Sequence, residues 1–457
     1  MNTTVLTAQM RTYFETGITK GFNFRLEQLQ KLKAVVQKYE IEIFEALYKD
    51  LHKSKEECWI TENGFFLSEI SIAIKKLSSW MKPEKVGTNL LNIPSSSFIM
   101  PEPLGVVFII SPWNYPFQLL FTPLIGAIAA GNCVVLKPSE LAPATAAIMK
   151  KIIEKTFDEK YILYVEGDGA TVVPELMNNF IFDHVFYTGS TAVGKIIYEL
   201  AAKNLVPVTL ELGGKSPCIV EADADIKTTA KRIAMPKFSN AGQMCVAPDY
   251  LLVHQSVKDE LVNELKKVIH NFFGDDAQKS EFFGRIINEK QFTRLEKYLS
   301  NGKLLSGGKI DRASLFIEPT LLEINDVNDT VMQEEVFGPI LPIISFREMN
   351  EAIKIIKLNK NPLAMYVFTS SAEKEKQWLN AVPFGGGCIN NASLHLTNHK
   401  LPFGGRGASG MGNYHGKFSF NTFSHKKAVM RTPTWLDLAI KYPPYTGKLN
   451  LFKKAIN

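Results

Sequence analysis

Residues 105–137, GVVFIISPWNYPFQLLFTPLIGAIAAGNCVVLK, decide the fold class. The stretch has no charged residue before Lys137, and it begins and ends with short runs of β-branched residues. Prolines and asparagines interrupt it, which a helix that spans a membrane tolerates poorly. The pattern therefore predicts a buried strand, a helix and a second buried strand.

Similar β-rich runs follow this unit along the chain. They are YILYV from residue 161, HVFYT from 184 and VPVTLEL from 206. Each spacing leaves room for one helix between successive strands, which is typical of a parallel sheet built from βαβ units. After Gly214 the alternation resumes with CIV, LLV and FIEPTLL, separated by helical stretches such as 257–273. The sequence thus predicts an α/β protein with two sheet-centred units.

The flanking regions differ from these units. Apolar residues at helical spacing between residues 24 and 80 predict helices with charges on their outer face. The segment 384–412 is dense in glycine and predicts loops and tight turns.

Composition indicates an ordinary soluble protein. Apolar residues make up 46% of the 457 residues and charged residues 21%, so the chain can fill two or three cores. The first twenty residues contain three charged side chains and no apolar run of a secretory signal, so we expect a cytoplasmic protein. The five cysteines are widely spaced without a CxxC pair, which predicts reduced thiols.

The positive charge is localised. The formal net charge is +6, and residues 426–457 alone contain seven Lys/Arg and one acid. The rest of the chain is balanced, so we expect no nucleic-acid partner. The basic tail either touches an anionic membrane or packs on the protein through Trp435, Leu436 and Tyr442, and we favour packing.

Three residues could form a catalytic group. Cys245 lies between Gly242 and Pro248, which suggest a turn that presents the thiol. Glu211 ends a predicted strand in apolar surroundings that resist ionisation, so it could take a proton from water. Asn114 follows another strand between two prolines, where its amide could donate to an oxygen that gains negative charge.

Each of these residues has an ordinary structural alternative. A single cysteine is usually a small buried hydrophobe, as we expect for Cys133, Cys218 and Cys388. An acid at a strand end often forms a salt bridge, and an asparagine beside proline often forms an Asx turn. The sequence pattern alone does not choose between these interpretations.

A cofactor turn is indicated at residues 189–194, GSTAVG, between the strand HVFYT and a helical run. This order directs backbone N–H groups and a helix N-terminus toward a pyrophosphate, although the full GxGxxG pattern is absent. In LKPSE, Lys137 and Glu140 follow another strand and could bind ribose hydroxyls. His395 and His399 are four residues apart in a segment unlike a zinc-binding helix, so we expect no metal site.

Taken together and in order, seven motifs resemble the NAD(P)-dependent aldehyde dehydrogenase superfamily. They are SPWNYPF, LKPSE, FYTGSTAVG, LELGGKSP, NAGQMCVAPD, EEVFGP and LPFGGRGASGMGNYHGKFSFNTFSHK. The resemblance runs from about residue 10 to about residue 447, and the form of several motifs is most similar to the class 3 branch, the fatty and aromatic aldehyde dehydrogenases.

The resemblance implies a role for each motif. Cys245 would be the nucleophile, Glu211 the general base, and Asn114 the side-chain half of the oxyanion hole, with the Cys245 N–H as the other half. The implied cofactor is NAD, with NADP as an alternative. Its implied contacts are Lys137 and Glu140 with the adenosine ribose, Gly189, Ser190 and Gly194 in the pyrophosphate turn, and Glu335 and Phe337 beside the nicotinamide ribose.

The resemblance also implies the domain organisation. A Rossmann-type dinucleotide-binding domain would comprise residues 1–82 and 104–210, and an α/β catalytic domain residues 211–391. A small β-arm of residues 83–103 and 392–430 would join two subunits into a homodimer, followed by a C-terminal tail of residues 431–457. This tail contains charges and three prolines, so no membrane span is expected from it.

Two residues depart from the family pattern. Met244 stands where class 3 members commonly have a smaller residue, and Arg406 adds a charge to the FGGxG turn, so the shape of the aldehyde pocket is open.

Three rival functions are an acylating dehydrogenase that uses coenzyme A, a cysteine hydrolase without a redox cofactor, and a binding protein that has kept the fold. Glu211 argues against the first, and the two cofactor motifs argue against the second.

Overall fold

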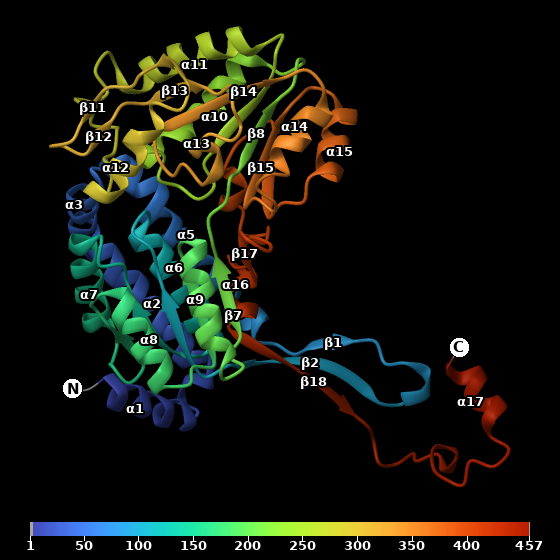
Figure 1. Ribbon diagram of the computed structural model, residues 1–457. Helices are drawn as coiled ribbons and strands as arrows, with labels where there is room; N and C mark the ends of the chain where they lie inside the picture. Colours follow the sequence, from blue (N-terminus) through green and yellow to red (C-terminus); the bar gives the residue numbers. More distant parts are fainter. Residues whose placement is uncertain (1–2, 457) are drawn as a thin grey trace.

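In the computed structural model, which describes residues 3–456, two α/β units lie against each other and an arm projects from one of them (Figure 1). The predicted α/β class is confirmed. None of the helices in residues 3–456 combines the length and the apolar character that a membrane span needs.

The first unit is centred on a six-stranded sheet in the order β17-β7-β6-β3-β4-β5. Its strands are β3 (Val106–Ile110), β4 (Cys133–Lys137), β5 (Ile162–Tyr164), β6 (His184–Thr188), β7 (Val208–Glu211) and β17 (Gly410–Met411). All are parallel except β17, which pairs antiparallel with β7 at the edge. The chain order reverses direction at β3 and β6, so the loops after these two strands leave the sheet on opposite faces and open a crevice between them.

Helices cover this sheet. They are α1 (Thr3–Glu15), α2 (Phe22–Lys38), α3 (Glu40–Leu51), α4 (Lys55–Cys58), α5 (Gly64–Trp80), α6 (Pro116–Ala130), α7 (Pro143–Thr156), α8 (Gly169–Asn179), α9 (Thr191–Ala202) and α16 (Lys417–Thr422). A short 3-10 turn, η1 (Ile18–Lys20), and a π-helical turn, η2 (Trp59–Asn63), complete the region. The helical prediction for residues 24–80 is thus confirmed. Every residue of α6 is buried, as expected for a helix that is apolar on all sides.

The second unit contains a seven-stranded sheet in the order β10-β13-β14-β9-β8-β15-β16. Its strands are β8 (Pro217–Val220), β9 (Tyr250–His254), β10 (Lys303–Ser306), β13 (Thr320–Glu323), β14 (Ile340–Phe346), β15 (Ala364–Phe368) and β16 (Gly386–Ile389). Its helices are α10 (Ile226–Phe238), α11 (Lys258–Phe273), α12 (Glu289–Tyr298), α13 (Thr330–Gln333), α14 (Met349–Ile356) and α15 (Ala372–Ala381), with the 3-10 turns η4 (Ser239–Gly242) and η5 (Leu394–Thr397).

One strand prediction and one loop prediction in this unit were wrong. FIEPTLL forms not one strand but two, β12 (Phe316–Ile317) and β13, because Pro319 interrupts it; β12 pairs with β11 (Ile310–Asp311) in a separate sheet. The glycine-rich segment 384–412 is not only loop, since β16 pairs in parallel with β15. A Cβ atom on Gly387 would lie 2.2 Å from the Met365 carbonyl oxygen, so the glycine permits the close strand contact instead of breaking the strand.

The arm is a three-stranded antiparallel sheet formed by β1 (Glu84–Val86), β2 (Ser96–Pro103) and β18 (Ser424–Arg431), with the turn η3 (Leu90–Asn92). Figure 1 shows it extending away from both units, with η6 (Ala439–Lys441) and α17 (Leu449–Ile456) beyond its end. The range 392–430 is divided in the structure. Only its last residues lie in the arm, whereas β17 pairs with β7 and α16 packs on α6.

The tail does not pack as expected. Trp435 is 76% exposed and Tyr442 is 52% exposed.

All five cysteines are free thiols; Cys133 and Cys218 are fully buried in β4 and β8, and Cys388 is half-buried.

Asn132 closes the first unit at the base of the arm. Its side chain accepts a hydrogen bond from the Gly105 N–H (2.9 Å) and donates to the carbonyl oxygens of Ala127 (3.2 Å) and Phe423 (2.9 Å). The side chain is completely buried, so no water replaces it. It therefore joins the start of β3 to the residue that precedes β18.

We predict that Asn132→Ala lowers the free energy of unfolding by about 2 kcal/mol or more, because it leaves buried backbone groups without partners at about 1–3 kcal/mol each. Denaturant unfolding measures the effect. The matched control is Asn179→Ala, which removes one exposed bond to the Glu175 carbonyl and should change stability by less than about 0.5 kcal/mol. Equal stability of the two variants would contradict the prediction.

Candidate active site

A cavity of about 870 Å³ lies between the two units. The carboxyl ends of β3, β6 and β7 supply one wall, as expected where parallel strands end at one edge of a sheet. Loops of the second unit supply the other wall. Most of the residues singled out in the sequence line this cavity, namely Asn114, Gly189, Ser190, Glu211, Cys245, Glu335 and Phe337.

Cys245 follows a strained turn. Asn240 and Ala241 both have a φ of 50°, in the left-handed region that disfavours side chains, and Gly242 has a φ of 74°. A Cβ on Gly242 would lie 2.2 Å from the Gly338 carbonyl oxygen, so only glycine fits there. Side-chain hydrogen bonds compensate for the strain, as is usual where a functional residue needs an unusual backbone. The turn that the sequence predicted around the cysteine is present.

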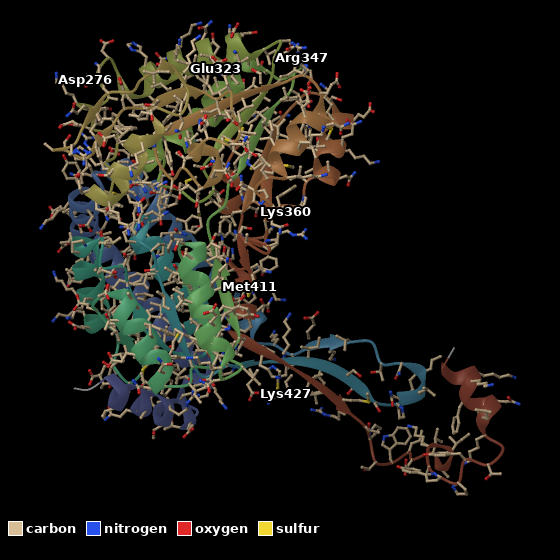
Figure 2. The ribbon with its side chains drawn as sticks, viewed as in Figure 1. Asp276, Glu323, Arg347, Lys360, Met411 and Lys427 are labelled. Carbon is tan, nitrogen blue, oxygen red and sulfur yellow. The ribbon has the colours of Figure 1, made fainter. Side chains whose placement is uncertain are left out.

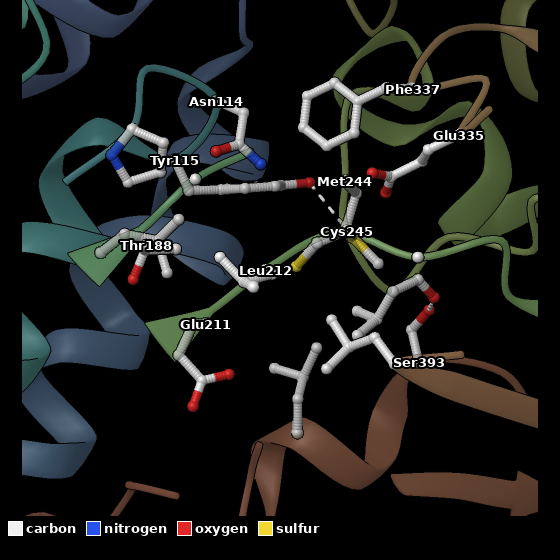
Figure 3. A pocket seen from close by; sticks show the side chains of 18 of the residues that line it. Asn114, Tyr115, Thr188, Glu211, Leu212, Met244, Cys245, Glu335, Phe337 and Ser393 are labelled. Carbon is white, nitrogen blue, oxygen red and sulfur yellow. Dashed lines mark hydrogen bonds between the residues drawn. The ribbon is translucent and has the colours of Figure 1, made fainter. Parts of the chain in front are cut away.

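The thiol of Cys245 is half-buried and faces two acids. Figure 3 shows Glu335 and Glu211 on different sides of it. Burial raises the pKa of the Cys245 thiol, and the charges of Glu335 and Glu211 raise it further. A protonated thiol is a weak nucleophile, so a reaction at this sulfur needs a base or a positive charge beside it.

Asn114 directs its amide group toward the cysteine loop. Its Nδ2 donates to the Gln243 carbonyl oxygen at 3.0 Å, and among residues 3–456 this is its one acceptor. The amide has two hydrogens, so the second can donate to a ligand in the cavity. The side chain is almost completely buried, which fixes its direction. Its own backbone carbonyl accepts from Lys53 Nζ and from Asn240 Nδ2.

Glu211 is the last residue of β7 and is only 3% exposed. Neither carboxyl oxygen has a hydrogen-bond partner among the residues that the structure describes. Burial therefore raises the pKa of Glu211 well above its usual value, because the charged form loses its hydration there. Figure 3 shows its carboxyl group pointing away from the sulfur of Cys245, so the side chain must rotate before it can take part in chemistry there.

The predicted pyrophosphate turn lies at the first residues of α9. Ser190 caps this helix by accepting from the Val193 N–H at 3.4 Å, and the residues before it line the cavity. A helix N-terminus attracts anions through its unpaired N–H groups. A Cβ on Gly194 would lie 2.6 Å from Leu212, so this glycine does not line the cavity but lets α9 approach the end of β7. Thr188 adds a buried hydroxyl without a partner among the described residues.

Lys137 and Glu140 lie one strand further along the sheet, at the end of β4, and are not among the residues that line the cavity. Lys137 is buried, and its Nζ donates to the Pro138 carbonyl (2.6 Å) and to Glu140 Oε2 (3.0 Å). The lysine thus orients an exposed carboxylate beside the crevice.

Glu335 and Phe337 enter the cavity from the loop before β14. Burial, followed by the nearby charge of Asp249, raises the pKa of Glu335 well above its usual value. A Cβ on Gly213 would clash with its carboxylate, so the glycine makes room for it. The Phe337 ring meets Trp113 edge-on, with ring centres 5.4 Å apart.

Several residues of the site were missed from the sequence. Lys53 and Glu62 form a buried ion pair behind Asn114, yet in the sequence they belong to charged helical segments that predict a solvated surface. Tyr115 donates from its hydroxyl to the sulfur of Met244 at 3.3 Å, which explains how the larger residue before Cys245 is accommodated. Arg406 is exposed and does not line the cavity.

The two histidines of the candidate metal pair do not converge on a ligand set. Burial lowers the pKa of His395 to about 4, and its Nδ1 lies 3.7 Å from the sulfur of Cys388. Among residues 3–456, no three His, Cys, Asp or Glu side chains are arranged to hold a metal ion.

Known proteins resemble this chain along almost its whole length. The sequence pattern of the aldehyde dehydrogenase family matches residues 9–429. The chain is 49% identical to 4,4'-diaponeurosporen-aldehyde dehydrogenase of Staphylococcus aureus over 97% of this chain and 96% of the relative. It is 45% identical to human aldehyde dehydrogenase family 3 member B1, with 96% and 94% covered.

A solved structure shares the fold closely. The substrate-bound state of Staphylococcus aureus AldH superposes with a TM-score of 0.96 at 48% identity, and the match covers 98% of each chain. Together with the matching family pattern and the cavity around Cys245, this similarity shows that the chain belongs to the aldehyde dehydrogenase family and is an oxidoreductase that acts on aldehydes.

Proposed function

We propose that this enzyme oxidises medium- or long-chain aliphatic or aromatic aldehydes to carboxylic acids with NAD(P)+, through a covalent intermediate on Cys245. One observation carries the proposal. Cys245, Asn114 and Glu211 come from three distant segments, yet all three line one cavity between the two units.

Cys245 is the proposed nucleophile. Its thiol proton passes to water in the cavity, and the thiolate Sγ then bonds to the aldehyde carbon. The carbonyl electron pair moves onto oxygen, which becomes an alkoxide. The free amide hydrogen of Asn114 and the backbone N–H of Cys245 donate to this oxygen, and both are held in place before the reaction begins.

The residues of the crevice suit a dinucleotide. The start of α9 offers N–H groups to a pyrophosphate, and Thr188, whose hydroxyl has no partner among the described residues, lies just before this helix in the chain. Gly189 and Ser190 would hold the pyrophosphate, Lys137 and Glu140 the adenosine ribose. Glu335 and Phe337 would hold the nicotinamide ribose. The bound cofactor supplies a hydride acceptor.

Glu140 favours NAD over NADP, because its carboxylate hydrogen-bonds ribose hydroxyls but repels a 2′-phosphate. Solved structures with this fold include an NAD-dependent aldehyde dehydrogenase and an enzyme complexed with NADP, so both cofactors belong in the assay.

Hydrolysis completes the proposed cycle. Loss of hydride from the alkoxide leaves a thioester on Cys245. Glu211 takes a proton from water, the water oxygen bonds to the acyl carbon, and the C–S bond breaks to release the carboxylic acid and the thiolate. Burial raises the pKa of Glu211, which makes its ionised form a better proton acceptor for this step.

The lining of the cavity supports apolar substrates. Phe65, Tyr115, Leu119, Met244 and Phe403 contribute side chains to it. Such surfaces bind alkyl chains and aromatic rings by excluding water. One relative is named for 4,4'-diaponeurosporen-aldehyde, which therefore joins the candidate substrates.

The proposal extends to the organisation of the protein. The unit around the six-stranded sheet would bind the dinucleotide, and the unit around the seven-stranded sheet would supply the nucleophile. The arm has β1 and β18 at its two edges, whose unpaired backbone groups could pair with a second copy, so we propose a homodimer in the cytoplasm.

We predict that the purified enzyme reduces NAD+ with a panel of aliphatic and aromatic aldehydes, without coenzyme A, and that Cys245→Ser lowers the rate by about 10³-fold or more. Absorbance of the reduced cofactor measures the rate, with NADP+ tested in parallel. Cys133→Ser, at a buried site remote from the cavity, is the control and should keep the rate. A folded wild-type enzyme that reduces neither cofactor with any aldehyde would refute the proposal.

We predict that turnover rises with pH through the raised pKa of Glu211, because only the ionised carboxylate can accept a proton and protonation at lower pH removes it. Glu211→Gln should lose this dependence and slow thioester hydrolysis by about 10²–10⁴-fold, leaving one rapid equivalent of reduced cofactor per site. Glu69→Gln, another buried acid with a raised pKa, is outside the cavity and should keep the wild-type pH profile. An unchanged profile in Glu211→Gln would exclude the general-base role.

We predict that Asn114→Ala lowers kcat by about 10²–10³-fold with a smaller change in KM, the usual effect of removing one donor to an oxyanion. Asn114→Asp keeps the size but replaces the donor by a negative charge, so its loss should be at least as large. Single-turnover rates of cofactor reduction decide the matter; a rate within a few-fold of wild type in both variants would remove Asn114 from the oxyanion hole.

A further inference from the structure

Lys53 and Glu62 form a completely buried ion pair behind Asn114, Tyr115 and Gln118, which line the cavity. Lys53 Nζ lies 2.7 Å from Glu62 Oε1, and both side chains have an exposed fraction of 0%. Glu62 comes from the π-helical turn η2, a local irregularity of the kind that often marks functional sites. A buried pair of this kind gains little stability over apolar residues of the same size. Stability alone therefore does not explain why a charged pair is buried beside the active site.

All three hydrogens of the Lys53 ammonium have a partner. One interacts with Glu62, a second donates to the backbone carbonyl of Asn114 at 3.0 Å, and the ammonium lies 3.9 Å from the centre of the Tyr115 ring. An ammonium has three donors, so this set is complete. The lysine thus holds two consecutive residues of the loop after β3.

Glu62 anchors the other end of the same loop. Its Oε2 accepts from the Gln118 N–H at 2.8 Å, in the first turn of α6. The pair therefore restrains the segment 114–118 at both ends. Only Asn114 and Tyr115 of this segment precede α6, so Lys53 contacts the two residues before the helix and Glu62 contacts its first turn.

The restrained carbonyl belongs to the residue whose amide faces the cysteine loop. Asn114 O accepts from Lys53 and from Asn240 Nδ2 (2.7 Å), while Asn114 Nδ2 donates to Gln243 O. Tyr115, under the same ammonium, donates to the sulfur of Met244 beside the nucleophile. A displacement of the Asn114 peptide would therefore move its amide and the pocket wall together.

We propose that Lys53 and Glu62 are positioning residues for the oxidation of the aldehyde. They hold the Asn114 peptide so that the free amide hydrogen points to the position of the alkoxide oxygen. They touch neither substrate nor cofactor, and they act through Asn114. This inference rests on the proposed role of Asn114 in the oxyanion hole.

The double variant Lys53→Met/Glu62→Gln tests the inference. It removes both charges, fills the space of the lysine chain and keeps an oxygen acceptor for the Gln118 N–H. We expect folded protein whose single-turnover rate of cofactor reduction falls by up to about 10²-fold, the scale on which small misplacement of a catalytic group acts. KM for the aldehyde should change much less than kcat. A rate per active site equal to wild type would overturn the inference.

The second arm repeats the double substitution in an Asn114→Ala background. If the pair acts through Asn114, its removal there should lower the rate by less than about 2-fold, because coupled residues are not additive. A further loss as large as in the wild-type background would overturn the inference. If Asn114→Ala alone keeps the wild-type rate, the proposed role of Asn114 fails instead, so the two failures are distinguishable.

A second ion pair, in which the glutamate is buried and the lysine partly exposed, supplies the control. Glu221 is 4% exposed, accepts from Lys374 Nζ (2.7 Å) and from Trp378 Nε1 (2.8 Å), and does not line the cavity. Lys374→Met/Glu221→Gln should lower the midpoint of thermal unfolding but leave the rate per active site unchanged. An equal fall in its rate would attribute the effect to general destabilisation and overturn the inference.

A single substitution covers the case in which the first double variant does not fold. Glu62→Gln alone removes the negative charge and keeps one oxygen acceptor, so it can accept from Lys53 or from the Gln118 N–H but not from both with the present geometry. The single-turnover rate should fall by several-fold in the wild-type background and not in the Asn114→Ala background. The opposite pattern would again overturn the inference.

Discussion

The hydrogen bond from the Asn114 amide to the Gln243 carbonyl joins the two halves of the active site. Asn114 belongs to the loop after β3 in the first sheet, and Gln243 to the turn that carries Cys245 in the second unit. Because this bond is buried, losing it would leave polar groups without water. The relative position of nucleophile and amide is therefore a property of the interface between the units, and neither unit could supply it alone.

Much of this arrangement could be predicted from the sequence. Runs such as HVFYT and CVVL are both buried and β-branched, and their spacing indicated a parallel sheet. Once the strands were placed, the direction of a parallel sheet brought Asn114, Ser190 and Glu211 to one edge, because all three follow strand ends. The motif around Cys245 indicated which residues form the other side of the cavity. The regular spacing of the β-rich runs thus explained why residues far apart in the chain lie close together.

What the sequence could not predict depends on contacts between distant side chains. Lys53 and Glu62 occur in charged helical segments and look like surface residues, yet both are buried against the loop after β3 and the first turn of α6. The apolar surroundings of Glu211 were predicted, but not that its carboxyl group points away from the sulfur of Cys245. In the segment 384–412, glycine density predicted turns, whereas close contact with Met365 made Gly387 part of a strand. Periodicity reports which face of an element is apolar, not which atoms meet there.

The sheet of the arm is completed only late in the synthesis of the chain. β2 pairs along eight residues with β18, which is translated about 320 residues later. At 5–20 residues per second, a ribosome takes roughly 15–60 s to reach the partner strand. During that interval one edge of β2 remains open, and the Asn132 amide lacks the Phe423 carbonyl that it later bonds. The nascent chain therefore carries a strand with one unpaired edge through most of its synthesis, and the prolines at 101 and 103 lower the capacity of that edge to capture a neighbouring chain.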